Sequence, residues 1–125
     1  MIEGVGVDIV KVERLREAAG RWGGRFLKRV FTDREIAYCM ARHEPYTSLA
    51  IRFAAKEALI KALGGDLFRL KEIEVLNRPD GSPFINLGEK LKEILSIKGV
   101  KKIHLSMSHE REFGIAFVVT EREGF

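Results

Sequence analysis

The chain has 125 residues, of which 46% are hydrophobic and 32% are charged. This length allows one hydrophobic core, so we expect a single domain over residues 1–125. No apolar run approaches the roughly 20 residues that a membrane-spanning helix needs. The N-terminal stretch lacks the basic region of a signal peptide, and the single Cys39 cannot form an internal disulfide. We therefore expect a cytoplasmic protein with no membrane partner.

The net charge of +4 is concentrated near the N-terminus. Segment 11–34 contains eight basic and three acidic residues, whereas the rest of the chain is slightly acidic. A basic patch of this kind favours an acidic partner, which the charge alone does not identify.

The first third of the chain predicts one strand and two helices. Residues 2–10 alternate between apolar and small or polar positions, as a strand does. Residues 11–30 have helical spacing, and the glycines near the middle should bend or break that helix. A capping box at Thr32–Glu35 should open a second helix that continues to about Ala41.

A long helix and several strands follow. The longest helical pattern covers 46–63, after Pro45, and Gly64-Gly65 should end it. Turn signals and alternating patterns predict strands at 71–77, 84–87, 101–107 and 112–120, with a short helix at 88–97. This order of elements predicts an α+β fold.

Asp8 is unusual because it lies in the middle of an apolar strand. Burying an unpaired carboxylate costs several kcal/mol, so Asp8 needs a partner or a metal. It shares its face of the strand with Gly4 and Gly6, which leave room for something to approach the backbone closely. The alternative is an edge-strand aspartate that faces solvent or caps the next helix.

The long helix carries charges on two sides. In RFAAKEALIKALGG they occur at Arg52, Lys56, Glu57 and Lys61. On a helical wheel Arg52 falls beside Lys56, and Glu57 falls beside Lys61 on a distant side. We expect Arg52 and Lys56 to form the solvent-exposed face of this helix. Glu57 and Lys61 then lie where buried apolar residues are expected, which favours a functional site there. The alternative is a surface ion pair worth a few tenths of a kcal/mol.

Other residues give weaker signals. Ser106, Ser108 and His109 lie at the turn between the last two strands and could donate to a phosphate. Cys39 has no recognisable activating neighbour, which argues against a thiol nucleophile. The sequence has neither a Walker-type loop nor a GxGxxG motif after a strand, so a nucleotide would be held in another way.

Four stretches, GVGVDIVKVERL, FTDREI, RFAAKEALIKALG and SMSHE, together resemble the holo-[acyl-carrier-protein] synthases. These are the small, trimeric branch of the 4′-phosphopantetheinyl transferases. The resemblance spans nearly the whole chain and implies a mainly antiparallel sheet with a long central helix. It also implies Mg²⁺-dependent transfer of 4′-phosphopantetheine from coenzyme A to a serine hydroxyl of apo acyl carrier protein. That reaction releases 3′,5′-ADP and supports fatty acid biosynthesis.

The resemblance also implies roles for individual residues. Asp8 and Glu57 match the Mg²⁺ ligands, and Lys61 matches a lysine that neutralises phosphate charge, which makes these three the catalytic candidates. Glu57 is the candidate base, acting either directly or through a water on the metal. Coenzyme A binding is implied for Arg52, Lys61, Gly64, Ser108 and His109.

The same resemblance implies a role for the basic segment 11–34. Acyl carrier proteins are acidic, and in this family the first helix docks them. The family also implies a homotrimer with active sites shared between subunits. The candidates for the docking surface are Arg14, Arg21, Arg25 and Lys28.

Two departures from the family pattern concern coenzyme A contacts. Glu110 follows His109 where the family usually has a small residue. The segment 64–68 differs from the more usual Gly-Thr-Gly pattern.

A competing hypothesis is a small basic nucleic-acid-binding module without catalysis. It is disfavoured because the aromatic residues are mostly Phe at core-like alternating positions, which leaves no evident stacking platform for bases.

Overall fold

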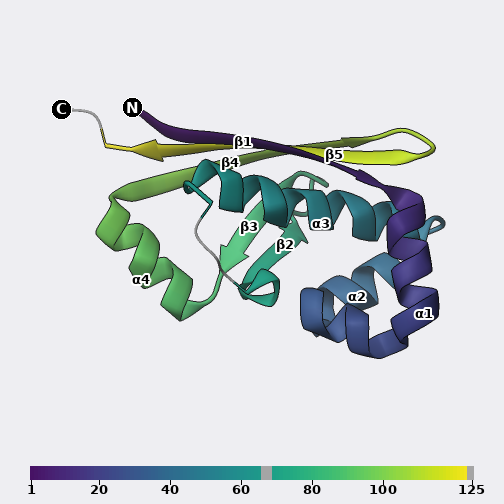
Figure 1. The fold of residues 1–125 in the computed structure, drawn as a ribbon. Coiled ribbons are helices and arrows are strands. Elements are labelled where there is room, and N and C mark those ends of the chain that lie inside the picture. The colour runs from purple at the N-terminus through teal and green to yellow at the C-terminus, as the bar shows by residue number, and fades with distance from the viewer. Residues whose placement is uncertain (66–68, 124–125) are drawn as a thin grey trace.

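The computed structural model describes residues 1–65 and 69–123, and it confirms the α+β fold. A three-stranded antiparallel sheet forms one layer, in the order β1 (Ile2–Lys11), β5 (Phe113–Arg122), β4 (Val100–His109). The long helix α3 (Pro45–Ala62) lies across this sheet. In Figure 1, α1 and α2 lie at one end of α3 and α4 lies at the other.

The two helices after β1 follow the predicted signals. Helix α1 (Val12–Val30) has a kink at Gly23, which adopts φ 62° and ψ −149°. Helix α2 (Asp33–Met40) begins with the expected capping box, in which Thr32 and Glu35 each bond the other's backbone N–H. Both the break and the helix start are therefore dictated by local sequence.

The second half of the chain supplies a hairpin and a short helix. A 3₁₀ turn (Leu70–Glu72) leads into β2 (Ile73–Asn77), which pairs in antiparallel fashion with β3 (Pro83–Leu87). Helix α4 (Glu89–Lys98) then ends at Gly99, which is left-handed with φ 80°. The two strands and α4 were predicted to within a few residues, whereas the 3₁₀ turn was not predicted and its residues 71 and 72 were assigned to the strand.

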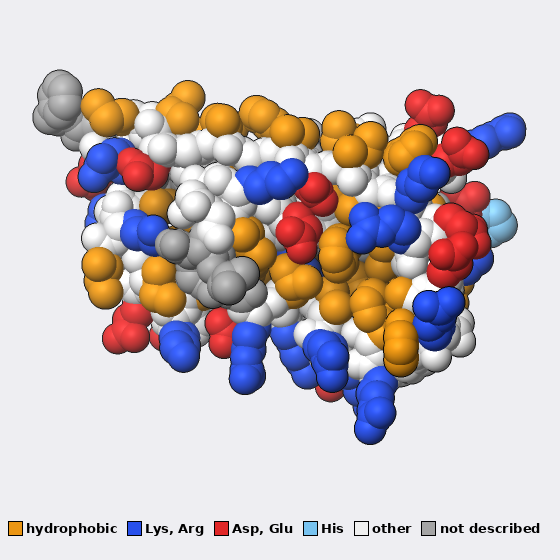
Figure 2. Space-filling view, viewed as in Figure 1, with side chains coloured by type: hydrophobic (Ala, Val, Ile, Leu, Met, Phe, Trp, Pro, Cys, Tyr) orange, Lys and Arg blue, Asp and Glu red, His pale blue; other side chains and the backbone are white. Residues whose placement is uncertain are grey.

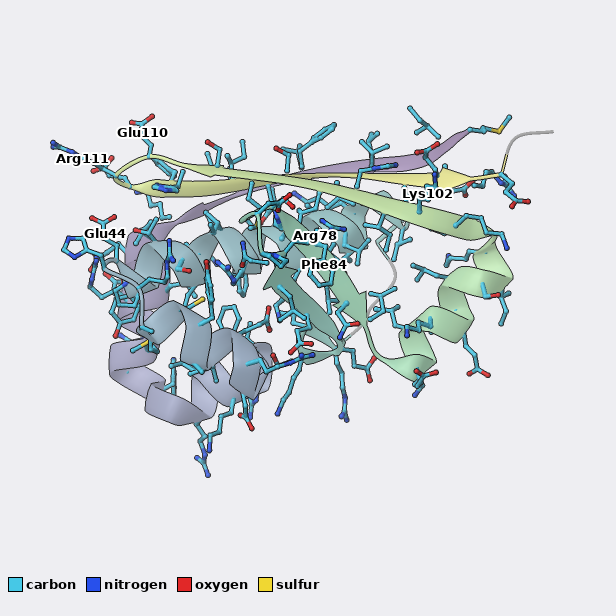
Figure 3. All side chains as sticks on the ribbon, turned by 180° about the vertical axis from the view of Figure 1, so that it is seen from behind. Glu44, Arg78, Phe84, Lys102, Glu110 and Arg111 are labelled. Carbon is cyan, nitrogen blue, oxygen red and sulfur yellow. The ribbon has the colours of Figure 1, made fainter. Side chains whose placement is uncertain are left out.

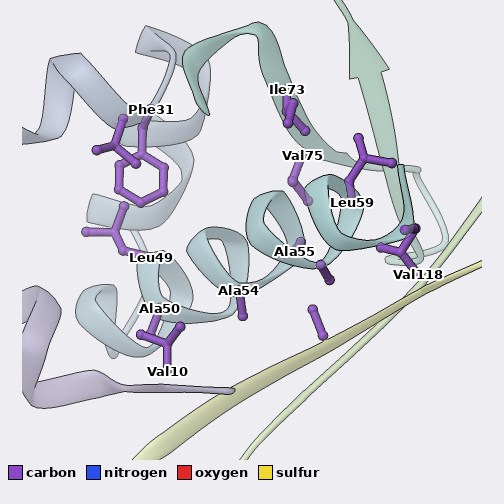
Figure 4. Packing of buried hydrophobic residues seen from close by; sticks show 14 of the residues in the cluster. Val10, Phe31, Leu49, Ala50, Ala54, Ala55, Leu59, Ile73, Val75 and Val118 are labelled. Atoms are coloured by element: carbon purple, nitrogen blue, oxygen red, sulfur yellow. The ribbon is translucent and has the colours of Figure 1, made fainter. Parts of the chain in front are cut away.

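The core lies between α3 and the elements that surround it. Figure 4 shows α3 side chains meeting Val118 from the sheet, Ile73 and Val75 from β2, and Phe31 directly after α1. Phe31 and Ile73 are completely buried. No helix within residues 1–65 and 69–123 is long and apolar enough to cross a membrane.

The two faces of the three-stranded sheet differ in the size of their side chains. The inner face, against α3, is built from small residues such as Gly114 and Ala116, because the helix lies close to the strands. The outer face carries larger apolar side chains that remain exposed, and Figure 2 shows them as a row along the sheet. Its exposed members are Val5, Val7, Ile9, Ile115 and Phe117.

Candidate active site

Strand β1 and helix α3 are in direct contact because two glycines face the helix. A Cβ added to Gly6 would lie 1.9 Å from the carbonyl oxygen of Ala58. One added to Gly4 would lie 2.0 Å from the carbonyl oxygen of Ala62. The close approach expected at these glycines is therefore made by α3. Asp8 follows on the same face of β1, so its carboxylate lies beside the helix.

The Asp8 carboxylate meets a lysine from α3. Lys61 Nζ lies 3.0 Å from Asp8 Oδ1 and also donates to the carbonyl oxygen of Val7. The Lys61 side chain is 54% exposed and that of Asp8 is 18% exposed. The structure thus gives Asp8 a charged partner, and it leaves the pair open to a ligand on one side.

Glu57 lies one turn before Lys61 and faces the same pair. Burial and the negative charge of Asp8 raise the pKa of Glu57, and the positive charges of Lys61 and Arg14 oppose that rise. Two carboxylates that share one surface repel each other when both are ionised, so a cation between them is favourable. Their oxygen atoms suit Mg²⁺, which commonly takes one or two protein carboxylates together with water and phosphate oxygens. The residues present therefore fit that metal.

The expectation that Arg52 and Lys56 form the solvent face of α3 is wrong. Arg52 is only 2% exposed and Lys56 is 0% exposed. Lys56 Nζ lies 2.7 Å from Oε1 of Glu35, a fully buried carboxylate on α2. A helical wheel separates the faces of a helix, but it does not show that α2 brings a carboxylate to one of them. The more open charged side is that of Glu57 and Lys61.

Arg52 lies in the wall of a cavity of about 400 Å³ on the other side of α3. It donates to the backbone carbonyl and hydroxyl of Ser48 and to Asn77 Oδ1, and it stacks on Tyr38 at 4.6 Å. Its Nε has no hydrogen-bond partner among the described residues. His109 lines the same cavity, so the structure brings these two predicted residues together. Further basic and polar lining residues are Arg42, His43, Thr47 and Glu44.

Ser108 and His109 lie on opposite faces of β4, although the sequence motif suggested one site. Ser108 is paired with Ile115, whose side chain belongs to the exposed outer face of the sheet. His109 points the other way, to the cavity. Figure 3 shows Glu110 at the tip of the β4–β5 hairpin, and Glu44 on the same side of the molecule. The carboxylates of Glu44 and Glu110 therefore lie near the Arg52 cavity, which is also lined by several basic side chains.

Gly64 lies two residues after the end of α3, close to Lys61. Its φ is 91°, and its N–H donates to the Lys61 carbonyl at 3.1 Å. Gly65 is also left-handed and bonds back to Ile60, which ends the helix as predicted. The family departure expected over 64–68 falls partly on residues 66–68, which lie outside the described residues.

The predicted docking residues lie on or beside two hollows of α1. Arg14 and Arg21 line a hollow of about 300 Å³ together with Trp22, Phe26 and Phe53. Arg25 lines a neighbouring one of about 310 Å³, and Lys28 is exposed on the same helix. Trp22 is 61% exposed, although it continues the apolar spacing of the first half of the helix. The basic surface therefore has an apolar part.

No local sequence pattern indicates the residues that hold Arg52. Tyr38 and Asn77 come from α2 and β2, and only the tertiary fold brings them to α3. Phe53 could have been inferred as part of the α1 surface, since it lies one turn before Glu57 on α3.

Comparison with known proteins gives consistent results. Residues 4–118 match the family model described as the 4′-phosphopantetheinyl transferase superfamily. The holo-[acyl-carrier-protein] synthase of Halothermothrix orenii is 45% identical over 97% of this chain and 98% of its own.

Solved structures agree with that match. The crystal structure of holo-[acyl-carrier-protein] synthase from Neisseria meningitidis has a TM-score of 0.92 at 34% identity, covering 98% of this chain and all of its own. The Helicobacter pylori enzyme in complex with coenzyme A has a TM-score of 0.81 at 30% identity, covering 94% of this chain and 99% of its own. With its fold and sequence matched over nearly their whole length, the chain belongs to the holo-[acyl-carrier-protein] synthases of the 4′-phosphopantetheinyl transferase superfamily.

Proposed function

We propose that this protein transfers 4′-phosphopantetheine from coenzyme A to a serine hydroxyl of apo acyl carrier protein, with Mg²⁺ held by Asp8 and Glu57. The observation that carries the site is the meeting of two carboxylates and one lysine where β1 contacts α3. Bound Mg²⁺ would neutralise the pyrophosphate of coenzyme A and orient it. We place the reaction in the cytoplasm, where coenzyme A and the carrier are both available to a protein of this kind.

The residues of the site have distinct tasks in this transfer. The serine oxygen attacks the β-phosphorus of coenzyme A, and a new P–O bond forms as the bond to the leaving 3′,5′-ADP breaks. Glu57 accepts the serine proton as the general base, either directly or through a water molecule. Lys61, whose side chain is half exposed, stabilises the negative charge that develops on the leaving phosphate.

The cavity beside Arg52 and His109 lies on the opposite side of α3 from Asp8 and Lys61. It is our candidate for the nucleotide end of a coenzyme A molecule whose pyrophosphate lies at the metal site of a neighbouring subunit. Its cations include Arg42 and Arg52, which suit phosphate groups. Arg52 is held rigidly by three hydrogen bonds and a ring contact, so little side-chain freedom is lost on binding. The related Helicobacter pylori structure contains coenzyme A, which supports a site of this kind in the family. Gly64 is our candidate for a backbone contact to the pantetheine arm.

We propose that the exposed apolar face of the sheet joins three copies of the chain. Val5, Val7, Ile9 and Phe117 are each between 46% and 58% exposed, an unusual number of large apolar side chains for one free surface. Ser108 lies on this face, so in a trimer it would stand at a subunit boundary, where it can contact coenzyme A. Light scattering should give a mass of three chains, and Val7→Asp should lower it to one.

The surface of α1 suits an acidic carrier protein. Arg14, Arg21 and Arg25 surround exposed apolar side chains, so a partner helix with both acidic and apolar residues is complementary to it. Arg14 also lies close enough to Glu57 to affect its pKa. A carrier docked here would therefore present its serine beside the proposed metal site.

The transfer can be tested by intact-mass spectrometry. Purified protein, Mg²⁺ and coenzyme A should add about 340 Da to an apo acyl carrier protein, the mass of one phosphopantetheine group. A carrier whose acceptor serine is replaced by alanine is the matched control. No mass increase across several carriers would contradict the proposal. Binding of the protein to nucleic acid in the same preparations would then favour the competing hypothesis.

A further inference from the structure

Lys56 is a completely buried cation that has no task in the proposed reaction. Its ammonium group donates to Glu35 Oε1 at 2.7 Å and to two backbone carbonyls, those of Val30 at 2.8 Å and Leu70 at 3.0 Å. An ammonium group has three donors, so all of them are used. The three acceptors belong to three different parts of the chain, which lie on the far side of α3 from the Asp8–Lys61 pair.

Glu35 extends this connection. Its Oε1 also accepts the N–H of Thr32, and its Oε2 accepts the N–H of Val75 at 2.9 Å. One buried ion pair therefore links the middle of α3 to the end of α1, the start of α2 and strand β2. Every polar atom of the pair has a partner, which is the condition for tolerating charges at this depth.

The end of α1 depends on contacts of this kind. The kink at Gly23 separates off a distal half, residues 24–30, which is too short to be a stable helix by itself. The carbonyl of Val30 is one of the last carbonyls of α1, which have no partner within the helix. Lys56 supplies a cation at this carbonyl, where the helix dipole favours positive charge. Its Nζ also lies 5.0 Å from the ring centre of Phe31, the buried residue that ends α1.

The distal half of α1 carries Arg25 and Lys28, two of the four residues that we assign to carrier docking. It also carries Phe26, which lines both hollows of that surface. Lys56 precedes Glu57 directly in α3, so one helix both anchors the docking half-helix and supplies the catalytic carboxylate. We propose that Lys56, paired with Glu35, is a positioning residue for carrier recognition, which fixes the distal half of α1 relative to the catalytic face of α3. This inference rests on the proposed docking function of α1.

Stability and positioning can be separated experimentally. Removing one member of a buried ion pair leaves a charge unpaired, whereas replacing both members by neutral side chains of similar volume is often neutral for stability. The test variant is therefore Lys56→Met combined with Glu35→Gln, which retains an oxygen acceptor for one of the backbone N–H groups. The matched control is Arg34→Met, because Arg34 forms the neighbouring ion pair with Glu74 without reaching α1.

The measurement is steady-state transfer with carrier and coenzyme A varied separately. For the double variant we expect the KM for the carrier to rise about tenfold, as for the loss of one charged hydrogen-bond anchor. The kcat and the KM for coenzyme A should stay within about twofold of wild type, and Arg34→Met should change none of the three. A folded double variant with an unchanged carrier KM, or with both KM values raised equally, would overturn the inference.

Two further variants make the result decisive. If the double variant does not fold, Lys56→Arg retains the charge but cannot place a planar guanidinium on the same three acceptors. It should raise the carrier KM at least about threefold, and an unchanged value refutes the positioning role.

Arg25→Glu tests the docking surface itself. If Arg25→Glu leaves the carrier KM unchanged, the docking proposal fails and this inference fails with it. If only the Lys56 variants behave like wild type, docking stands and positioning alone is wrong.

Discussion

Two lysine–carboxylate pairs on the same helix have opposite environments. Lys56 and Glu35 are 2.7 Å apart and completely buried, and each of their polar atoms is bonded to the protein. Lys61 and Asp8 are 3.0 Å apart, and the lysine is half exposed. Every charged-group atom of the buried pair is hydrogen-bonded to another part of the fold. The open pair, with Glu57 beside it, retains capacity for a metal and a phosphate, and this difference distinguishes a structural ion pair from a candidate site.

The largest effect should come from the open side of α3. Glu57→Gln keeps the shape of the side chain but removes a metal ligand and the candidate base, so we expect kcat to fall at least about a thousandfold. The fold should be unchanged, since Glu57 makes no hydrogen bond that holds other elements together among those described. Steady-state rates at saturating Mg²⁺, with circular dichroism as the check of folding, measure this. Glu93→Gln on the exposed side of α4 is the control. Near wild-type rates for Glu57→Gln would show that Glu57 is neither an essential metal ligand nor the base.

The two lysines should differ in their effect on stability. Lys56→Met leaves the Glu35 charge buried without its cation, so the free energy of unfolding should fall by about 3–5 kcal/mol. Lys61→Met removes a largely exposed ion pair and should cost no more than about 1 kcal/mol, while it impairs transfer. Chemical denaturation of both variants at one pH gives the comparison. Equal losses of stability would remove the distinction between the two pairs.

A smaller effect concerns the protonation of Glu57. Burial and the charge of Asp8 raise its pKa, so Asp8→Asn should lower that pKa while burial keeps part of the rise. The raised pKa makes the folded protein bind a proton more readily than the unfolded chain. Glu57 therefore opposes folding as pH rises through its titration, and Asp8→Asn should reduce this loss. NMR titration of the Glu57 carboxyl group in the metal-free protein measures the shift, and an unchanged or higher pKa in the variant would show that the two carboxylates do not interact.

Local sequence signals were sufficient for most of the fold. The capping box at Thr32, the kink at Gly23 and the helix end at Gly64 each depend on residues within one or two turns. The exposed face of α3 could not be predicted in this way. Whether Lys56 is solvated depends on Glu35, which is distant in sequence and reaches α3 only through the packing of α2.

The candidate site was predicted unevenly. Helical spacing related Glu57 to Lys61, but only the family resemblance related either of them to Asp8. The grouping of Ser108 with His109 came from a motif, and the alternation of side chains along a strand already argues against it. The residues around Arg52 were missed because their contacts are entirely tertiary.

In the proposed site, Asp8 and Glu57 hold the metal that binds the phosphates of coenzyme A. Crystals grown with coenzyme A and Mn²⁺, which replaces Mg²⁺ and scatters anomalously, test it directly. We predict an anomalous peak within coordination distance of both carboxylates and of the pyrophosphate, with Lys61 beside the phosphate oxygens. Coenzyme A bound with the peak elsewhere, or with none between Asp8 and Glu57, would show that these carboxylates do not form the metal site.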